Sequence, residues 1–484
     1  MKSQWKWHRL FLSSLIATTI TTSLFDTNSY RATANSHQTL SNTQRLSQFQ
    51  TIGLKKSGGL STLVKPNLNR ANSRKTISLG ERSPIVTDWI RQFGTLGDDS
   101  SGRISIDKAG NVYVVGSTSG SLGGANAGNY DAFVTKYDNR GNRLWIRQWG
   151  TSGYDGASDV AVDNAGNVYV AGSTGGSVVT SRSISGATSI NIISNTVAFV
   201  TKYDTNGNQL WTKQFGTATT LGIRLALDSS DNVYITGNSN NSLGGVFAGG
   251  IEDAFVAKYS SSGTQLWIRQ LGTSSDDNSF AIGVDSTGNV YIAGYTDGLL
   301  GSTRAGGRDA YIAKYNTSGT QLWIQQLGTS ADDLIYGLAL DSNGNIYITG
   351  NTTGSLGGTN AGGSDVFIAK YNSSGTRLWT KQLGTNTDDY SGGIAVDSTG
   401  NAYITGFTKG SLGETNLGSY DAWIGKYDSN GQLLWKEQLG TVADDEAFGI
   451  AVQGNSIYLT GETAGALAAP NAGSYDAWLA KFSL

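Results

Sequence analysis

The sequence predicts an all-β fold, a seven-bladed β-propeller of four-stranded antiparallel blades. A segment of the type Trp-x-x-Gln-x-Gly-Thr recurs seven times, with its Trp at Trp89, Trp145, Trp211, Trp267, Trp323, Trp379 and Trp435. The spacing is 56 residues except for one interval of 66, and a fixed period of this size is typical of repeat architectures. Gly accounts for 66 of 484 residues and Pro for 3, which suits tight turns between short strands.

Each repeat resolves into four strands, here on the copy that contains Trp323. The predicted strands cover residues 280–285, 290–294, 310–315 and 321–327, and Gly-containing hairpins join the first two and the last two. Both faces of these strands are apolar or aromatic, so each sheet needs cover on both sides. Neighbouring copies supply that cover, and no sheet is expected to be stable alone.

The ends of the chain favour a closed ring over an open stack. The first repeat signal is a lone fourth strand at residues 87–94, and the last is a third strand at residues 476–482. These two fragments complete one blade only if they pair, which closes the ring and removes its free edges. An open stack would need atypical capping repeats at both ends, and the sequence contains none.

Three regions are predicted. Residues 1–34 carry a basic start, a short apolar run and an Ala-x-Ala site, which indicate a signal peptide; an uncleaved anchor is the alternative. Residues 35–83 are rich in Ser, Thr and Asn and form a flexible basic linker, either solvated or touching an anionic envelope surface. Residues 84–484 form the propeller. Export to the cell surface, the periplasm or the medium follows, with no membrane span after removal of the signal.

Composition excludes several classes of function. The chain has no Cys, and its two His residues, His8 and His37, precede the propeller. Nucleophile systems that use His, thiolate chemistry and the usual zinc sites are therefore excluded from the repeats. Residues 1–83 carry 12 Lys+Arg and 2 Asp+Glu, which leaves 23 basic and 35 acidic residues, a net charge of −12, for the propeller. Nucleic acid is not an expected partner of an acidic domain.

The repeats resemble a known family. Residues 395–406 read Ala-Val-Asp-Ser-Thr-Gly-Asn-Ala-Tyr-Ile-Thr-Gly, and an Asp-Ala-aromatic step and Leu-Trp-x-x-Gln-Leu-Gly-Thr follow. This pattern resembles the bacterial SBBP-type β-propeller repeats over nearly all of residues 84–484. The resemblance implies an exported propeller. It implies no activity and no catalytic residue.

Acidic residues recur where a fourth strand leads into the next first strand. A ring of carboxylates near the channel mouth would suit a Ca²⁺ ion or a sugar hydroxyl, whereas a residue present in most blades is more simply a turn residue that accepts backbone N–H bonds. No cofactor is predicted, and Ca²⁺ remains the alternative. The candidate ligand-binding carboxylates are Asp99, Asp155, Asp277, Asp333, Asp389 and Asp445.

Repetition breaks at one long connection. The segment from Gly172 to Val197 is ten residues longer than its counterpart from Gly116 to Asp131, and the next connection, residues 216–222, lacks acids. Both irregularities are expected on one face, with Arg182 and Arg224 as candidate ligand-binding residues. A functional loop on a rigid scaffold and plain drift of one repeat remain open explanations.

These observations predict a non-enzymatic binding or scaffolding module for protein or glycan at the cell envelope, with residues 173–196 as its contact surface. A carbohydrate-active hydrolase or lyase that uses Asp and Tyr residues of the channel mouth is the alternative, and an oligomerising surface-layer component is a third hypothesis. The ligand, the signal cleavage position and the oligomeric state stay open.

Overall fold

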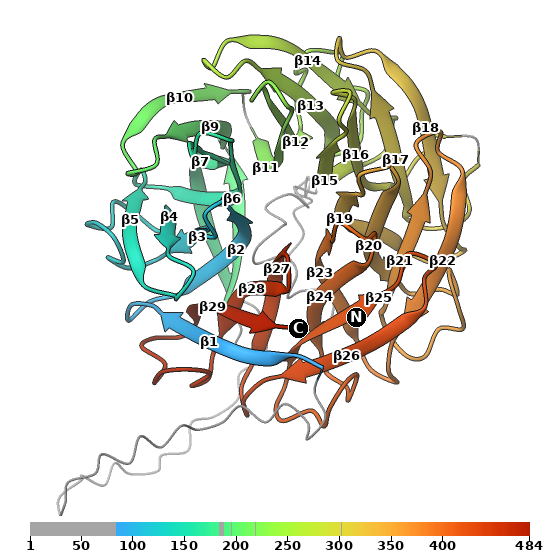
Figure 1. Cartoon of the computed structure of the whole chain (residues 1–484). Helices are drawn as coiled ribbons and strands as arrows, with labels where there is room; N and C mark the ends of the chain where they lie inside the picture. The colour runs from blue at the N-terminus through green and yellow to red at the C-terminus, as the bar shows by residue number, and fades with distance from the viewer. Residues whose placement is uncertain (1–83, 183–187, 195, 218, 302) are drawn as a thin grey trace, which may run out of the picture. The chain divides into compact units, whose positions relative to one another are not determined.

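Seven antiparallel sheets are arranged as the blades of a ring (Figure 1). A computed structural model describes residues 84–182, 188–194, 196–217, 219–301 and 303–484. The predicted signal peptide (1–34) and linker (35–83) lie outside the described residues. No helix in the part that is described is long and apolar enough to cross a membrane.

Each blade is a meander in which the strand nearest the ring axis comes first. Blade 1 contains β2 (Asp99–Ile106), β3 (Val112–Thr118), β4 (Asp131–Tyr137) and β5 (Arg143–Trp149). Blade 2 contains β6 (Tyr154–Val162), β7 (Val168–Arg182), β9 (Val197–Tyr203) and β10 (Gln209–Phe215), with β8 (Thr188–Ser194) paired to β7. Blade 3 contains β11 (Thr220–Leu227), β12 (Val233–Ser239), β13 (Asp253–Tyr259) and β14 (Gln265–Leu271).

The other blades follow the same order. Blade 4 contains β15 (Asp277–Val284), β16 (Val290–Thr296), β17 (Asp309–Tyr315) and β18 (Gln321–Leu327). Blade 5 contains β19 (Asp333–Leu340), β20 (Ile346–Thr352), β21 (Asp365–Tyr371) and β22 (Arg377–Leu383). Blade 6 contains β23 (Asp389–Val396), β24 (Ala402–Thr408), β25 (Asp421–Tyr427) and β26 (Leu433–Leu439). Blade 7 combines β27 (Asp445–Gln453), β28 (Ser456–Thr463) and β29 (Asp476–Ser483) with β1 (Val86–Phe93).

The ring is closed by the first and last strands, which confirms the prediction. β1 pairs antiparallel with β29, and Ile90 faces Ala480 in the register. Gln92 reinforces the junction, because its Nε2 donates to Asp476 Oδ2 at 2.9 Å. Inner strands β2 and β27 also pack against each other. The closing blade therefore has the same four-stranded order as the others.

The hydrophobic core lies between the blades. β3, β4, β12, β13, β16 and β17 are buried along their whole length. One core cluster joins Tyr234 and Val256 of blade 3 to Ile292 and Tyr311 of blade 4. Each sheet is thus covered on both faces by its neighbours, as the apolar pattern predicted.

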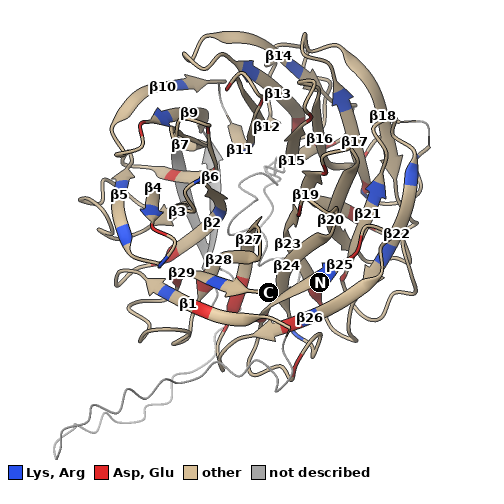
Figure 2. Cartoon of the chain, in the orientation of Figure 1, with Lys and Arg blue, Asp and Glu red and all other residues tan. Residues whose placement is uncertain are grey.

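The recurring Trp joins the outer edge of one blade to the next blade. Trp267 of β14 donates from Nε1 to the carbonyl of Thr317, in the hairpin between β17 and β18, at 3.0 Å. Arg269 donates from Nε to the Gly319 carbonyl of that hairpin, also at 3.0 Å. Gly319 has φ +78°, and an added Cβ would lie 2.9 Å from Trp267 Cδ2. The hairpin needs Gly for its backbone and for this contact. The Lys and Arg residues of the outer strands lie along the rim of the ring (Figure 2).

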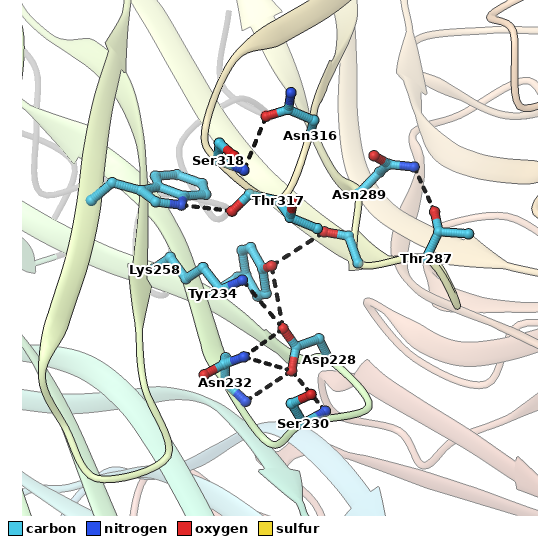
Figure 3. Close-up of polar contacts among 12 residues, drawn as sticks. Asp228, Ser230, Asn232, Tyr234, Lys258, Thr287, Asn289, Asn316, Thr317 and Ser318 are labelled. Carbon is cyan, nitrogen blue, oxygen red and sulfur yellow. Dashed lines mark hydrogen bonds and ion pairs between the residues drawn. The ribbon is translucent and has the colours of Figure 1, made fainter.

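In blades 1 to 6, the hairpin between the first two strands is closed by an Asp, whereas blade 7 has Gln453 at this position. In blade 3, Asp228 Oδ1 accepts from the backbone N–H groups of Ser230 and Asn232, both at 2.9 Å (Figure 3). Its Oδ2 accepts from the Tyr234 hydroxyl, and Lys258 Nζ lies 3.4 Å away. Side-chain hydrogen bonding of this kind fixes a turn without a bound ion.

We predict that Gly319→Ala lowers the free energy of unfolding by about 2–4 kcal/mol, because left-handed backbone geometry and overpacking against Trp267 add. The matched control is Gly454→Ala, where φ is +59° but no atom lies within 4 Å of the added Cβ, so only about 1–2 kcal/mol is lost. Urea unfolding of both variants measures the difference. Equal losses would show that the Trp contact contributes nothing.

A second prediction tests ring closure. The chain has no Cys, so the double variant Ile90→Cys/Ala480→Cys introduces two thiols that face each other across β1 and β29. We expect them to form a disulfide on mild oxidation, because facing residues of antiparallel strands lie within disulfide range. Non-reducing electrophoresis detects the cross-link.

The control pair is Ile90→Cys/Leu479→Cys, in which the second thiol points to the opposite face of the sheet. Preferential cross-linking of this control pair would contradict the register of the closing blade.

Candidate functional site

The structure places the six candidate carboxylates at the start of inner strands, where the connections from the preceding blades end. Each of them is 0 % exposed. Asp389 is typical: its Oδ2 accepts from the backbone N–H of Thr385 at 2.5 Å and from the Thr385 hydroxyl at 2.9 Å. Its Oδ1 accepts from the Thr408 hydroxyl at 2.5 Å. The same contacts hold Asp99, Asp155 and Asp445. These groups tie the end of one blade to the start of the next.

Burial dominates the electrostatics of these turns. It raises the pKa of Asp99, Asp277, Asp333 and Asp389, while the Thr hydrogen bonds act in the opposite direction. Burial raises the pKa of Asp445 to about 6. The described residues contain no group of three or more acidic or imidazole side chains that could hold a metal. A ligand-binding or Ca²⁺-binding role for these carboxylates stays a prediction.

The long connection of blade 2 is a β-hairpin rather than the loop that the sequence analysis expected. β7 continues beyond its last pair with β9, Thr174 and Val197, and pairs with β8 from Ser177 to Arg182. The physical reason is local composition, because Val178, Val179, Ile190, Ile192 and Ile193 are β-branched residues that favour strands. Arg182 lies at the end of β7, opposite Thr188.

Arg224 does not join Arg182 on the loop face. It lies on β11 with 4 % exposure and lines the central channel. Two further charged residues line the same place: Arg103 on β2 and Asp159 on β6. Sequence reasoning missed both. A comparison of the seven inner strands at one position would have found them. This position lies four residues after the Asp or Thr that begins the strand or follows its first residue. The residues there are Arg103, Asp159, Arg224, Ala281, Gly337, Gly393 and Gly449.

Three adjacent blades therefore carry charge where the other four carry Ala or Gly. A register shift in each inner strand falls at or just before this position, for example between Ser101 and Ile104 and between Gly222 and Arg224. Bulges of this kind re-aim side chains and are common beside functional sites. The sevenfold repetition of the chain is thus broken inside the channel.

Arg103 reaches across the channel to three other blades. Its Nη1 donates to the Phe448 carbonyl of β27 at 2.5 Å. Its Nη2 donates to the carbonyls of Tyr336 in β19 and Gly392 in β23, both at 3.1 Å. An added Cβ at Gly393 would lie 2.5 Å from Nη1, so the missing side chain there makes room for the guanidinium.

Asp159 and Arg224 complete the cluster. Asp159 Oδ2 accepts from the backbone N–H of Leu225 at 2.9 Å, and Arg224 Nη1 donates to the Ile223 carbonyl at 2.7 Å. Burial raises the pKa of Asp159, and the positive charge of Arg224 opposes this rise. Burial lowers the pKa of Arg103 to about 10. Burial, followed by the positive charge of Arg103, also lowers the pKa of Arg224. The two guanidinium groups therefore interact electrostatically.

The cluster borders a cavity of about 150 Å³ that takes residues from all seven inner strands. Besides the charged residues, its wall contains Tyr336, Ala281 and Gly337, and an apolar layer formed by Ile104, Ile282, Leu338, Ile394 and Ile450. Polar atoms form most of the surface that lines this small cavity, and the Ile and Leu residues contribute the smaller part.

Fold and site together define a closed seven-bladed β-propeller with an asymmetric, charged channel. Residues 88–123, 144–178, 210–244, 266–301, 322–357 and 378–414 match the SBBP family, described as "Beta-propeller repeat". The propeller thus contains six segments that match SBBP repeats, which confirms the resemblance seen in the sequence.

Two relatives have curated sequences. An uncharacterised WD repeat-containing protein of Acanthamoeba polyphaga mimivirus is 25 % identical over 441 residues, covering 69 % of this chain and 31 % of the relative. The regulatory protein FlaEY of Caulobacter vibrioides is 26 % identical over 277 residues, covering 49 % and 29 %. The chain thus spans about a third of each relative. Among solved structures, the WD40 β-propeller domain of Doa1 aligns with a TM-score of 0.45 and 10 % identity, over 81 % of this chain and 97 % of that domain.

We predict that Asp445 makes stability depend on pH. Its pKa is 3.8 ordinarily and about 6 in the folded state, so the folded state holds the proton more tightly. The stabilisation that protonated Asp445 gives to the folded state is fully present below about pH 4 and is lost as the pH rises through about 6. Urea unfolding at pH 4.5, 5.5 and 7 measures the free energy of unfolding of the native protein and of Asp445→Asn. The excess stability of the native protein over this variant should shrink as the pH rises.

The control is Asp204→Asn in an exposed hairpin, where hydrogen bonds to Asn208 lower the pKa of the Asp204 carboxyl. The difference in free energy of unfolding between the native protein and this variant should stay constant above pH 4.5. An advantage of the native protein that grows with pH at Asp445 would contradict the assignment.

Proposed function

We propose that this β-propeller is an exported, non-enzymatic binding or scaffolding module that engages a protein or glycan at the cell envelope. The β7–β8 hairpin of blade 2 and the adjacent connections form its contact surface. Export rests on the signal-like residues 1–34, so the site of action is the periplasm, the cell surface or the medium.

The observation that carries the proposal is the extra hairpin. The regular blades have four strands, whereas blade 2 has a fifth, β8, which pairs with β7 in the part of the chain that the structure describes. The segment that pairs with β8 begins at Ser177, after β7 has made its last pair with β9 at Thr174 and with β6 at Gly176. From Ser177 on it therefore extends past the four-stranded sheet. A two-stranded ribbon at the edge of a rigid scaffold offers backbone N–H and C=O groups to a partner strand.

The remaining architecture supports binding rather than catalysis. The recurrent carboxylates close turns, and the charged cluster of the channel is held by backbone carbonyl and N–H groups. Repetition places the turn acids in similar settings, whereas acid–base hydrolysis requires two carboxyl groups in unlike environments. Both relatives are longer proteins, of which this chain matches about a third.

The test replaces residues 175–196 of blade 2 with residues 119–130 of blade 1, the shorter connection at the same place. We expect the thermal unfolding midpoint to change little, because all pairs between β7 and β9 are kept and only the pair of Tyr154 with Gly176 is replaced. Co-sedimentation with purified peptidoglycan sacculi and with envelope vesicles should fall at least about tenfold, the loss expected when a main contact of an interface is removed.

The matched control makes the same replacement in blade 5, where residues 353–364 are exchanged for residues 119–130. This variant should bind like the native protein. Binding that is unchanged in the blade 2 variant would reject the hairpin as the contact surface. Turnover of a polysaccharide by the native protein would instead favour the hydrolase or lyase alternative.

A further inference from the structure

The channel cavity is lined by charged residues together with Ile and Leu residues, and its surface is mostly polar. Arg103, Asp159 and Arg224 lie on blades 1, 2 and 3, and the five Ile and Leu residues named above form the apolar layer. Two guanidinium groups and one carboxylate give the lining side chains a formal charge of +1. A charge held in a low-dielectric interior favours a ligand of the opposite sign.

Arg103 retains donors for a ligand. A guanidinium has five N–H groups, and the hydrogen bonds of Arg103 to Phe448, Tyr336 and Gly392 use three of them. The Nε–H and one Nη1–H group remain. The three carbonyl acceptors come from three different blades, so the guanidinium is held in place before any ligand arrives, which reduces the entropy lost on binding.

The size of the cavity limits the ligand. A cavity of about 150 Å³ accommodates a molecule with roughly the volume of benzene, which has about six non-hydrogen atoms. Small residues opposite the cluster, Ala281 and Gly337, create part of this space. Sugars and nucleotides are too large, and the excess of guanidinium over carboxylate disfavours cations.

We infer that the channel is a binding site for a small organic monoanion, a carboxylate with a short aliphatic tail of the size of propionate. Its carboxylate accepts hydrogen bonds from Arg103 and lies in the field of Arg224, and its tail contacts the Ile and Leu layer. Asp159 holds the Leu225 backbone and sets the net charge of the site at +1. This inference is independent of the contact surface proposed for blade 2.

The experiment measures binding of propionate to the full chain by ligand-observed NMR and calorimetry. We expect saturable binding with one site per chain. Propionamide has nearly the same shape and no charge, and it should bind at least about tenfold more weakly, because charge-assisted hydrogen bonds are roughly twice as strong as neutral ones. Equal binding of propionate and propionamide, or no saturable binding, would overturn the inference.

Three channel variants separate a ligand site from a structural cluster. Arg224→Met removes one positive charge and should weaken propionate binding at least about tenfold. Asp159→Asn removes the opposing charge and should tighten binding by about threefold or more. Ala281→Leu fills the cavity while keeping all charges, and it should abolish binding without lowering the unfolding midpoint, since filled cavities stabilise.

The matched control is Arg147→Met, which removes an outer-strand guanidinium that stacks on Trp145 and should leave binding unchanged. Variants that unfold are excluded by their circular dichroism spectrum, and the tightening in Asp159→Asn remains decisive because misfolding does not produce it. Weaker binding in Asp159→Asn, or undiminished binding in Ala281→Leu, would contradict the site.

Discussion

The contact between the Trp of an outer strand and the Gly of the next blade's hairpin is the constraint on which the structure depends. The hairpin glycines Gly141, Gly207, Gly263, Gly319, Gly375 and Gly431 lie against the Trp of the preceding blade. The contact joins an outer edge to its neighbour, while the Asp and Thr side chains of the connections join the inner edges. Because each sheet is apolar on both faces, these contacts and the shared core make the ring one cooperative unit.

Repetition also determines what a residue can do. A carboxylate that recurs in blade after blade meets the same Thr partners each time, and its hydrogen bonds are used to fix a turn. Asymmetry arises where the blades differ, which happens at the β7–β8 hairpin and in the channel. There, Arg103, Asp159 and Arg224 face small residues of the other blades. The hairpin and the channel lie on different elements, and the partners we propose for them differ, one macromolecular and one small.

The sequence predicted the fold well and the site partly. The four strands predicted for the repeat with Trp323 agree with β15, β16, β17 and β18 within three residues. The seven blades are confirmed, and the predicted pair of residues 87–94 with 476–482 agrees with β1 and β29 within one residue. The insertion before Val197 was located correctly but was expected to be a loop, because length alone does not reveal that its two halves pair. Arg224 was selected for its position near that irregularity, and Arg103 and Asp159 were missed, because they are 56 residues apart and neither forms a local motif.

The sequence by itself determined the period, the alternation of apolar and aromatic residues, and the two incomplete ends, and these are sufficient for a closed seven-bladed ring because they are local or repeated properties. Only the tertiary structure decided that the inner strands converge on one axis. Because the inner strands converge, the seven equivalent positions lie close together around the axis. The charged residues of blades 1, 2 and 3 therefore lie beside the space that Ala and Gly leave in the other blades. Distances across that axis depend on the closure of the whole ring, and no segment of the chain contains them.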